Sequence, residues 1–483
     1  MQLLKKSDKE HLYLRLSGMI EDQINNDLLK IGDKLPSVRT MKKTYGVSIS
    51  TIMQAYYHLE SKGLVEARPQ SGYYVRFSPK NFPAQPTKSN PDYKPGSNSA
   101  EEIIDEVYQN ISNSERIVFS LGIPSLQLMP VPKLNKTMTE AMRRMSFGGI
   151  GYENVQGNFR LRKQIAKWSI TWEGRLTPDD IITTTGCMDA LSLSLAAITE
   201  KGDTVAVESP CFFSILQLAE SMSLKVVELP TDPTLGIDID ALRKNITNKK
   251  IKAIILMSNF SNPLGCCILD NNKKEIVQLI QNHNIPLIED DIYGDIFFTK
   301  SRPKTCKSFD DSGLVLLCSS FSKTLAPGYR VGWVAPGKYI EKIRRLKLYR
   351  EVSSATLQQE AVAMFLENGR YEHHLRKLRN ILHISSMQYI RTISGFFPKG
   401  TRISHPQGGL FLWVELDKKA DTFNIYKKAI KDNISISPGR MFTLKDQFHN
   451  CMRLCYGLPW NERIEEALIR VGKFANEAVI KIG

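Results

Sequence analysis

A lysine stands among hydroxyl side chains and an arginine in the second half of the chain. Lys323 follows Ser320 and Ser322, Arg330 comes shortly after it, and the apolar run 314–318 precedes them all. A lysine amine can form an imine with an aldehyde. An arginine with neighbouring hydroxyls can hold a phosphate through charge-assisted hydrogen bonds. This segment therefore predicts a site for an aldehyde that carries a phosphate.

Short apolar runs alternate with helical stretches through the middle of the chain. This alternation predicts an α/β fold, a sheet covered by helices. Ligands of such folds bind beyond the carboxyl ends of the strands, so the residues after each run are candidates for a site. The expected strands are 181–184, 205–207, 225–229, 253–257, 286–289, 314–318 and 331–334, and a smaller α+β domain is expected from 401–405, 410–415 and 434–437.

A glycine and an aromatic residue follow the first two of these strands. Gly186 and Cys187 open a helix, whose free N–H groups and positive dipole end suit a phosphate. Phe212 comes after the second strand, where its ring can stack on a planar cofactor. A place in the hydrophobic core is the alternative interpretation of this phenylalanine.

Polar side chains follow two further strands. Asp290 ends an apolar run, where a carboxylate is costly without a cationic partner such as a pyridinium nitrogen. Asn262 and Tyr293 can both bond to a phenolate oxygen. An ordinary capping role is the alternative for the acids 289–291 taken alone. With Lys323, a stacking ring and a phosphate cradle, these residues form the set that pyridoxal 5'-phosphate requires. The sequence therefore predicts this cofactor.

The first 77 residues have a different pattern, with three short amphipathic helices and a hairpin. The helices are expected from 16 to 26, from the cap Ser37 to Tyr45, and from the cap Ser48 to Gly63; the hairpin is expected from 64–67 and 73–76. Two helices joined by a tight turn, followed by a hairpin, predict a winged helix-turn-helix over residues 8–77. A structural or dimerisation module is the alternative.

The exposed face of the third expected helix supplies candidates for contact with double-stranded DNA. Gln54 can read an adenine edge, and Ser50 and Thr51 can reach phosphates or bases. Gly72 in the hairpin allows the backbone to approach a sugar-phosphate strand closely. Ser48, which caps this helix, is also a candidate contact.

The head resembles the winged helix-turn-helix of the GntR family, in the stretches 12–14, 32–39, 47–48, 59–64 and 71–75. This resemblance implies that Arg39 and the hairpin around Gly72 contact an operator. Family members usually carry an arginine where this chain has Ile49. The change predicts weaker or differently specified binding.

Proline recurs among Lys, Asn and Ser between residues 78 and 100. Such a segment buries too little apolar surface to fold, so a flexible tether is expected over 78–115, with a short helix at 101–111. The effector domain would then span 116–480.

Composition narrows the cellular setting. The net charge is +15, which suits a polyanion partner but is also typical of a well-solvated surface. The eight cysteines lack metal-ligand spacing. No apolar run approaches the roughly 20 residues that span a bilayer, and the N-terminus has no signal-peptide pattern. A cytoplasmic protein without a membrane partner is expected.

The effector domain resembles the class I aminotransferases of fold type I. The matching stretches include Tyr152 with Gly157, the cofactor set above, and 451–457 around Arg453. The resemblance implies a homodimer in which Tyr152 reaches the phosphate of the opposite subunit. It also implies that Arg453 holds a substrate or effector carboxylate, for which a guanidinium fork is well suited. A surface ion pair is the alternative for Arg453.

The whole chain resembles the MocR-type, or GabR-like, branch of the GntR regulators. The resemblance implies a transcription regulator that senses an amino acid or amine through aldimine chemistry at Lys323, within a head-to-tail homodimer. Two alternatives stay open: a working aminotransferase with an appended DNA-binding domain, and a regulator that responds to the cofactor itself.

Overall fold

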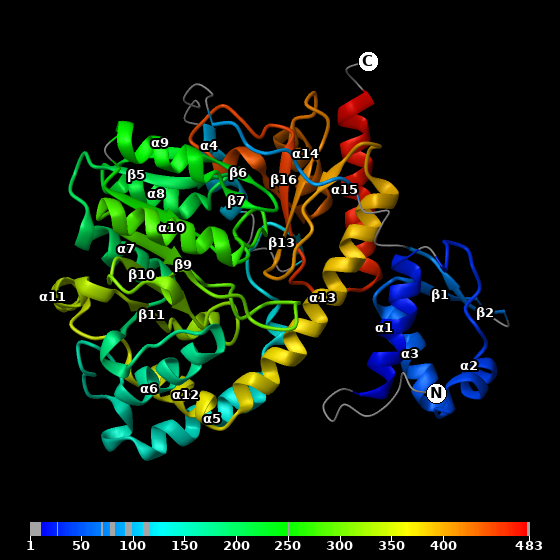
Figure 1. Ribbon diagram of the computed structural model, residues 1–483, viewed down its shortest axis with the longest axis horizontal. Helices are drawn as coiled ribbons and strands as arrows, with labels where there is room; N and C mark the ends of the chain where they lie inside the picture. Colours follow the sequence, from blue (N-terminus) through cyan, green and yellow to red (C-terminus); the bar gives the residue numbers. More distant parts are fainter. Residues whose placement is uncertain are drawn as a thin grey trace.

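The computed structural model describes residues 11–26, 28–68, 71–77, 83–91, 99–109, 115–249 and 251–480. The expected α/β architecture with an N-terminal helical head is confirmed: the head lies at the right of Figure 1, beside the long helix α13 (Arg370–Phe396). The expected start of the head at residue 8, the hairpin turn 69–70, and the parts 78–82, 92–98 and 110–114 of the expected tether lie outside the described residues. Within the described ranges, each helix is too short or too polar to cross a bilayer.

The head forms the helices and the hairpin that its sequence predicts. Ser37 and Ser48 cap their helices, because each side chain accepts the N–H of the residue three positions later. Gly46 has the left-handed conformation expected of a helix end. The elements are α1 (Leu12–Asn25), α2 (Val38–Tyr45), α3 (Ile49–Ser61), β1 (Val65–Arg68) and β2 (Gly72–Val75).

A buried tyrosine ties the elements of the head together. The hydroxyl of Tyr56 on α3 donates to the carbonyl oxygen of Pro36, which lies just before α2. Its ring lies 5.0 Å from that of Tyr73 in the hairpin. The third helix is thereby fixed against both of its neighbours.

The core of the body is an eight-stranded sheet with the order β4-β11-β10-β9-β8-β5-β6-β7. Neighbours from β10 to β6 run parallel, whereas β11 is antiparallel to both β10 and β4. The carboxyl ends of β4, β10, β9, β8 and β5 therefore meet at one edge. The strands are β4 (Ile182–Thr184), β5 (Thr204–Ser209), β6 (Lys225–Asp232), β7 (Gly236–Ile237), β8 (Ala253–Leu256), β9 (Leu287–Asp290), β10 (Val315–Ser320) and β11 (Gly332–Ala335).

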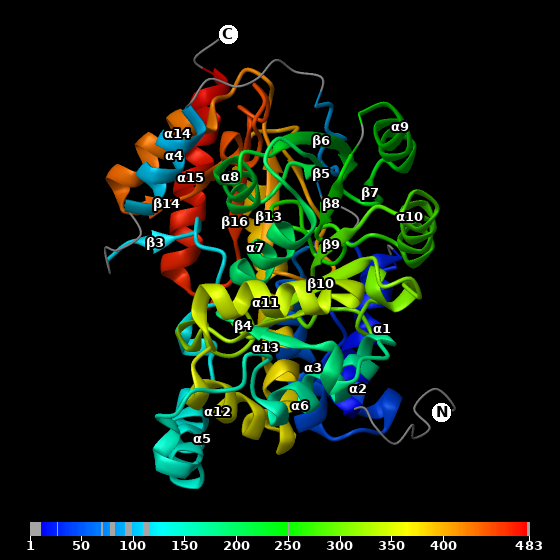
Figure 2. The same ribbon diagram turned by 90° about the vertical axis from the view of Figure 1, so that its left-hand side faces the viewer.

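Helices cover both faces of this sheet (Figure 2). Val205 and Val207 belong to one buried cluster and Ala206, between them, to another, as the alternation of a strand requires. Each face is thus sealed by its own hydrophobic layer. The helices of this part are α5 (Val131–Arg144), α6 (Phe159–Ser169), α7 (Cys187–Ile198), α8 (Phe213–Ser221), α9 (Ile239–Lys249), α10 (Asp270–His283), α11 (Ile340–Glu351) and α12 (Thr356–Glu367).

The smaller domain is built on a four-stranded antiparallel sheet with the order β12-β13-β16-β15. The expected strand at 434–437 divides into two: β14 pairs with β3 near the start of the body, and β15 joins the sheet. The elements are β3 (Ile117–Val118), β12 (Arg402–Ile403), β13 (Phe411–Glu415), α14 (Thr422–Ala429), β14 (Ile434–Ser435), β15 (Ser437–Pro438), β16 (Cys451–Cys455) and α15 (Glu462–Ile480).

The segment between head and body differs from the expected free tether. Residues 83–91 are hydrogen-bonded to the body; for example, Ala84 accepts the backbone N–H of Ile403 at 2.9 Å. The expected helix at 101–111 forms as α4 (Ser99–Gln109). Composition indicated a segment without a core of its own; for residues 83–91 the body supplies hydrogen-bond partners.

The head also contacts the body of its own chain. The side-chain amide of Gln388 on α13 donates to the carbonyl oxygen of Ser61, the last residue of α3, at 2.5 Å. Leu59 and Leu64 of the head belong to the same hydrophobic cluster as Tyr389 and Ile390 of α13. The other end of α13 reaches the loop that follows β10, where His374 bonds to the carbonyl oxygen of Thr324.

The buried hydrogen bond of Tyr56 gives a test of the head. Tyr56→Phe removes the hydroxyl that donates to Pro36, so the free energy of opening α3 should fall by about 1 kcal/mol. Hydrogen exchange of the α3 amides in the full chain measures it. Tyr57→Phe, at a neighbouring position that is 55% exposed, is the control and should have a much smaller effect. Equal effects of both substitutions would contradict the assigned role.

Candidate functional site

The predicted cofactor residues gather at one edge of the large sheet. Asp290 is the last residue of β9 and pairs with Cys318 of β10, the strand that leads to Lys323. Gly186 follows β4, and Phe212 follows β5. Because these strands point the same way, the residues that follow them face a common space, as the sequence predicts.

Arg330 and the start of α7 form a cradle that suits a phosphate. The guanidinium donates to Ser322 Oγ at 3.4 Å and to the Thr185 carbonyl at 3.1 Å. Ser320 Oγ accepts the N–H of Ser322 at 3.3 Å. Gly186 has φ +90°, and a Cβ there would collide with the Arg330 guanidinium. Only glycine therefore lets the arginine lie against the amino end of α7, where free N–H groups favour an anion.

Asp290 is a buried carboxyl whose hydrogen-bond donors among the described residues are neutral. Cys187 Sγ lies 3.3 Å from its Oδ1, and the N–H of Ile292 donates to the same oxygen at 3.1 Å. Burial raises the pKa of Asp290 to about 7. A cationic ring nitrogen would reverse this cost, because an opposite charge stabilises the ionised form.

Lys323 has an amine that loses its proton more readily than an ordinary lysine. Burial lowers its pKa to about 8, and the positive charge of Arg453 acts in the same direction. The neutral amine is the form that attacks an aldehyde. Together with the cradle and Asp290, this lysine fits pyridoxal 5'-phosphate.

Arg453 on β16 faces the same space from the smaller domain. It is 1% exposed and donates to Asn262 Oδ1 at 2.9 Å, to Ser437 Oγ at 3.0 Å and to the Ser120 carbonyl. Its Nε has no hydrogen-bond partner among the described residues. Burial lowers its pKa. The alternative of a surface ion pair is thus wrong, and the site holds a buried guanidinium that an anion can pair with.

Two further predicted residues lie in the same site. The hydroxyl of Tyr293 is 3.5 Å from the Gly122 carbonyl, the outer limit of a hydrogen bond, so it can take a better acceptor. Phe212 is half-buried, with its ring 4.7 Å from that of Phe213. Asn262 keeps its amide group available, since only its Oδ1 is engaged with Arg453.

Tyr152 stands apart from this set. It is 89% exposed, as are its neighbours Phe147 at 88% and Ile150 at 87%. These three residues, called the exposed apolar patch below, lie within six positions of one another in the chain.

Tyr108 on α4 is a residue that no sequence pattern singles out. Its ring lies 5.6 Å from that of Phe213, which also contacts Phe212 and Phe442. The guanidinium of Arg453 lies 5.0 Å from the Phe442 ring. Burial raises the pKa of Tyr108, and the charge of Arg453 opposes the increase. The helix after the connecting segment thus brings Tyr108, which is 43% exposed, within electrostatic reach of the arginine.

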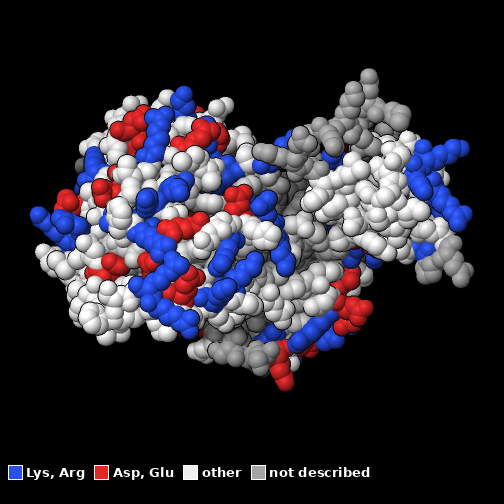
Figure 3. All heavy atoms as spheres, turned by 90° about the horizontal axis from the view of Figure 1, so that it is seen from below, with Lys and Arg blue, Asp and Glu red and all other residues white. Residues whose placement is uncertain are grey.

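The predicted DNA contacts lie on the surface of the head. Ser48 caps α3 and also bonds to the hydroxyls of Ser50 and Thr51. Figure 3 shows Lys and Arg gathered at the end of the head away from the body. The exposed positions among the predicted contacts are Arg39, Ser48, Ser50, Gln54 and Gly72, and Thr51 is half-buried.

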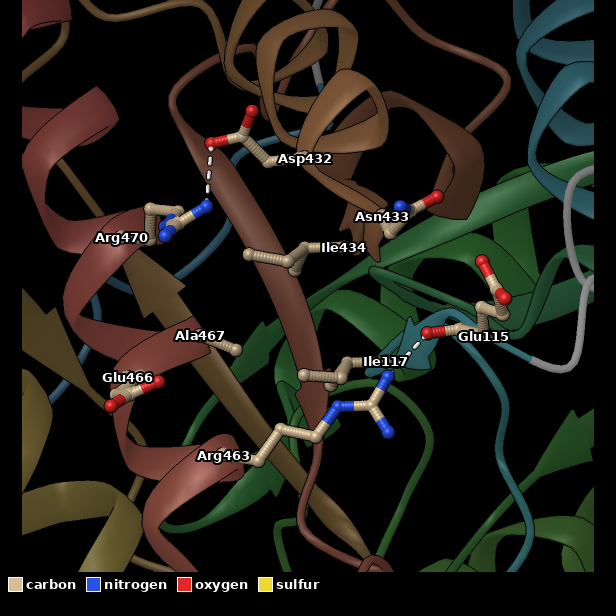
Figure 4. Close-up of a pocket in the computed structure, with 9 residues that line it drawn as sticks. All are labelled: Glu115, Ile117, Asp432, Asn433, Ile434, Arg463, Glu466, Ala467 and Arg470. Carbon is tan, nitrogen blue, oxygen red and sulfur yellow. Dashed lines mark hydrogen bonds and ion pairs between the residues drawn. The ribbon is translucent and has the colours of Figure 1, made fainter.

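A separate surface cavity of about 550 Å³ lies between β3, β14 and α15 (Figure 4). Its arginines already have partners: Arg470 pairs with Asp432 at 3.3 Å, and Arg463 donates to the Glu115 carbonyl. None of the predicted cofactor residues lines it.

Two protein families match the chain. The aminotransferase class I and II family matches residues 116–471, and the gntR family of bacterial regulatory proteins matches residues 12–75. The chain belongs to the class I and II aminotransferase family and carries a GntR-type DNA-binding head, the architecture of the MocR-type transcription regulators.

Individual relatives support both halves of this assignment. The HTH-type transcriptional regulator YjiR of Escherichia coli (strain K12) is 36% identical over 467 residues, which cover 97% of this chain and 99% of the relative. NorG of Staphylococcus aureus (strain USA300), also an HTH-type regulator, is 28% identical over 443 residues, covering 91% and 98%. The predicted identity as a regulator is confirmed.

Solved aminotransferases share the fold of the body. The multiple substrate aminotransferase of Thermococcus profundus has a TM-score of 0.74 at 24% identity, covering 78% of this chain and 95% of its own. LysN of Thermus thermophilus, solved with N-(5'-phosphopyridoxyl)-L-leucine, has a TM-score of 0.72 at 23% identity, covering 79% and 98%.

The close approach of Gly186 to Arg330 yields a prediction. Gly186→Ala should displace the guanidinium and weaken the binding of pyridoxal 5'-phosphate about tenfold or more, the loss of one charge-assisted hydrogen bond. Titration of the cofactor-free chain, followed by absorbance, measures it. Gly328→Ala in the same loop is the control, because a Cβ there meets nothing within 4 Å. Equal affinities of the two variants would contradict the cradle.

The lowered pKa of Lys323 predicts how cofactor capture depends on pH. The rate should rise with pH as the amine loses its proton and level off above about 8, because burial lowers the pKa to that value. Asp290→Asn removes a nearby negative charge that raises this pKa, so its midpoint should move to lower pH. Stopped-flow absorbance measures both. A midpoint near 10.5, the pKa of an ordinary lysine, would contradict the assignment.

Proposed function

We propose that this transcription regulator binds pyridoxal 5'-phosphate at Lys323 and senses an amino acid or amine that binds beside it. The observation that carries the proposal is the buried guanidinium of Arg453, which has no carboxylate partner among the described residues and faces the predicted cofactor residues. A buried, unpaired charge is costly. An effector carboxylate would remove that cost, and Arg453 would thereby select for compounds that carry one.

The other side chains divide the binding of the cofactor among them. Once bound, the cofactor supplies an aldehyde carbon that can pass between Lys323 and an incoming amine. Asp290 would hold the proton on the ring nitrogen, and Phe212 would stack on the ring. The remaining contacts would be Asn262 and Tyr293 to the phenolate oxygen, and Gly186, Cys187, Ser320, Ser322 and Arg330 to the phosphate.

The exposed apolar patch supports a homodimer as the working form. Phe147, Ile150 and Tyr152 would be covered by a second copy, with Tyr152 reaching the partner's phosphate site. In the single chain, the head lies on its own α13. The same contact can be exchanged between subunits, as in domain swapping, and this exchange would give the head-to-tail pairing that the resemblance implies.

Two heads in a dimer would bind paired half-sites of one DNA operator. Gln54 and Ser50 on the exposed face of α3 are placed for the major groove, and Arg39 on α2 for the backbone. A regulator bound to chromosomal DNA works in the cytoplasm.

A catalytic aminotransferase is the second candidate, because the side chains that transamination needs occupy the same site. One experiment separates the functions. The cofactor-loaded chain is mixed with a panel of amino acids and amines, with and without a keto-acid acceptor. Cofactor absorbance, keto-acid formation and affinity for DNA from upstream of its own gene are then measured.

A compound that alters both the absorbance and the DNA affinity without sustained turnover is the expected result. Turnover with unchanged DNA affinity would instead establish an enzyme. DNA affinity that responds only to pyridoxal phosphate would establish a sensor of the cofactor.

Arg453→Gln should lower the affinity for that compound roughly 30-fold or more, because it removes one side of a buried charge pair. DNA binding without the compound should stay unchanged. Arg470→Gln, which changes an exposed arginine of the separate cavity, is the control. Unaltered effector affinity in the Arg453 variant would contradict its role.

A further inference from the structure

The segment 83–91, here called the strap, is bonded to the edge of the smaller domain. Thr87 donates to the carboxylate of Glu415 twice, from its N–H at 2.6 Å and from its Oγ1 at 2.8 Å. Ala84 accepts the N–H of Ile403 at 2.9 Å. This part of the strap therefore follows the ends of β12 and β13.

The next residues of the strap are bonded to the large domain instead. The N–H of Ser89 lies 3.2 Å from the carbonyl oxygen of Thr231 on β6, and Ser89 Oγ accepts the N–H of Thr231 at 2.8 Å. Lys88 forms an ion pair with Asp238 at 2.5 Å. The strap thus bridges the two domains within a few residues.

The strap has two anchors, Glu415 on the smaller domain and Thr231 on the large domain. Each anchor lies on a strand next to one that carries or leads to a residue of the proposed effector site. Glu415 is on β13, whose Trp413 pairs with Arg453 of β16. Thr231 is on β6, which pairs with β5, the strand that leads to Phe212. Each anchor therefore moves with one wall of that site.

The strap has little slack between these anchors. Only Lys88 separates Thr87 from Ser89, and an extended chain over that interval spans at most about 7 Å. A change in the relative position of the domains cannot be absorbed between the anchors. It must break a hydrogen bond or move the strap, whose preceding residues lead back to the head.

We propose that the strap transmits effector binding to the head by linking the relative position of the two domains to the path of the chain between head and body. This inference rests on the proposed function, because an effector held by Arg453 on one domain and Lys323 on the other is what would change that relative position. An effector that favours one arrangement then shifts the population of head positions.

The test uses the full-length chain and N-(5'-phosphopyridoxyl)-L-leucine, a stable compound that carries both the phosphopyridoxyl group and a carboxylate. Hydrogen exchange is compared between the forms bound to pyridoxal phosphate and to this compound. In the unaltered chain, exchange should differ in the strap and in the head. Calorimetry gives the affinity for the compound.

The double variant Thr87→Val/Ser89→Ala removes the hydrogen bond of Thr87 Oγ1 and the 2.8 Å hydrogen bond of Ser89 Oγ, together with a weak contact of that Oγ at 3.5 Å, and keeps the shapes of both side chains. Its strap amides should exchange about fivefold faster, the effect of losing one hydrogen bond at each end. Its affinity for the compound should be unchanged, but the response of the head should be lost. The matched control is Thr247→Val/Ser221→Ala, at exposed positions on α9 and α8.

Three results would refute the inference. If hydrogen exchange in the head of the double variant changes as much as in the unaltered chain, the signal takes another path. The single variant Thr87→Val should then show the full change as well. If the compound binds the unaltered chain tightly but hydrogen exchange of the strap does not change, the role of the strap is refuted and the proposed function is not. Failure of the compound to bind the unaltered chain would refute the proposed function and this inference with it.

Discussion

Charged side chains that are buried without ionic partners are the constraint on which this structure depends. Asp290 and Arg453 each face the space beyond the carboxyl edge of the large sheet, and their hydrogen-bond partners in the part of the chain that the structure describes are neutral. Such groups destabilise an empty protein. The ligand proposed above would supply the missing charges, a cation for Asp290 and an anion for Arg453. The large sheet positions Asp290 and the smaller sheet positions Arg453, and Gly186 before α7 admits the guanidinium of Arg330.

The two charges lie on different domains, so ligand binding affects the relative position of the domains. A ligand that satisfies both must join the large domain, which carries Asp290 and Lys323, to the smaller one, which carries Arg453. In an enzyme, the joining serves to exclude water. In a chain with a DNA-binding head, the same movement can serve as a signal. The individual side chains do not distinguish an enzyme from a sensor. The attached DNA-binding head favours the sensor.

The sequence predicts the strands and the residues that follow them well, because both depend on local patterns. The seven apolar runs form β4, β5, β6, β8, β9, β10 and β11, whereas the short β7 was not predicted; the sheet brings Gly186, Asp290 and Lys323 to one edge. Contacts between segments that are distant in the chain were harder to predict from the sequence. A proline-rich composition indicated a tether, although its hydrogen-bond partners, such as Glu415 and Thr231, lie far along the chain. Tyr108 was missed for the same reason, since only the docking of α4 brings its ring to Phe213.

The helix α13 has a consequence for how such proteins can change over evolution. It is a single helix of 27 residues that bonds near one end to Thr324, next to Lys323, and near the other to Ser61 of α3. A continuous α-helix is rigid, and each residue adds a rise of about 1.5 Å and a rotation of about 100°. Inserting or deleting one residue between His374 and Gln388 would rotate the position at which α13 contacts the head by about 100° around the helix axis. The length of this helix is thus expected to tolerate less variation than its exposed residues.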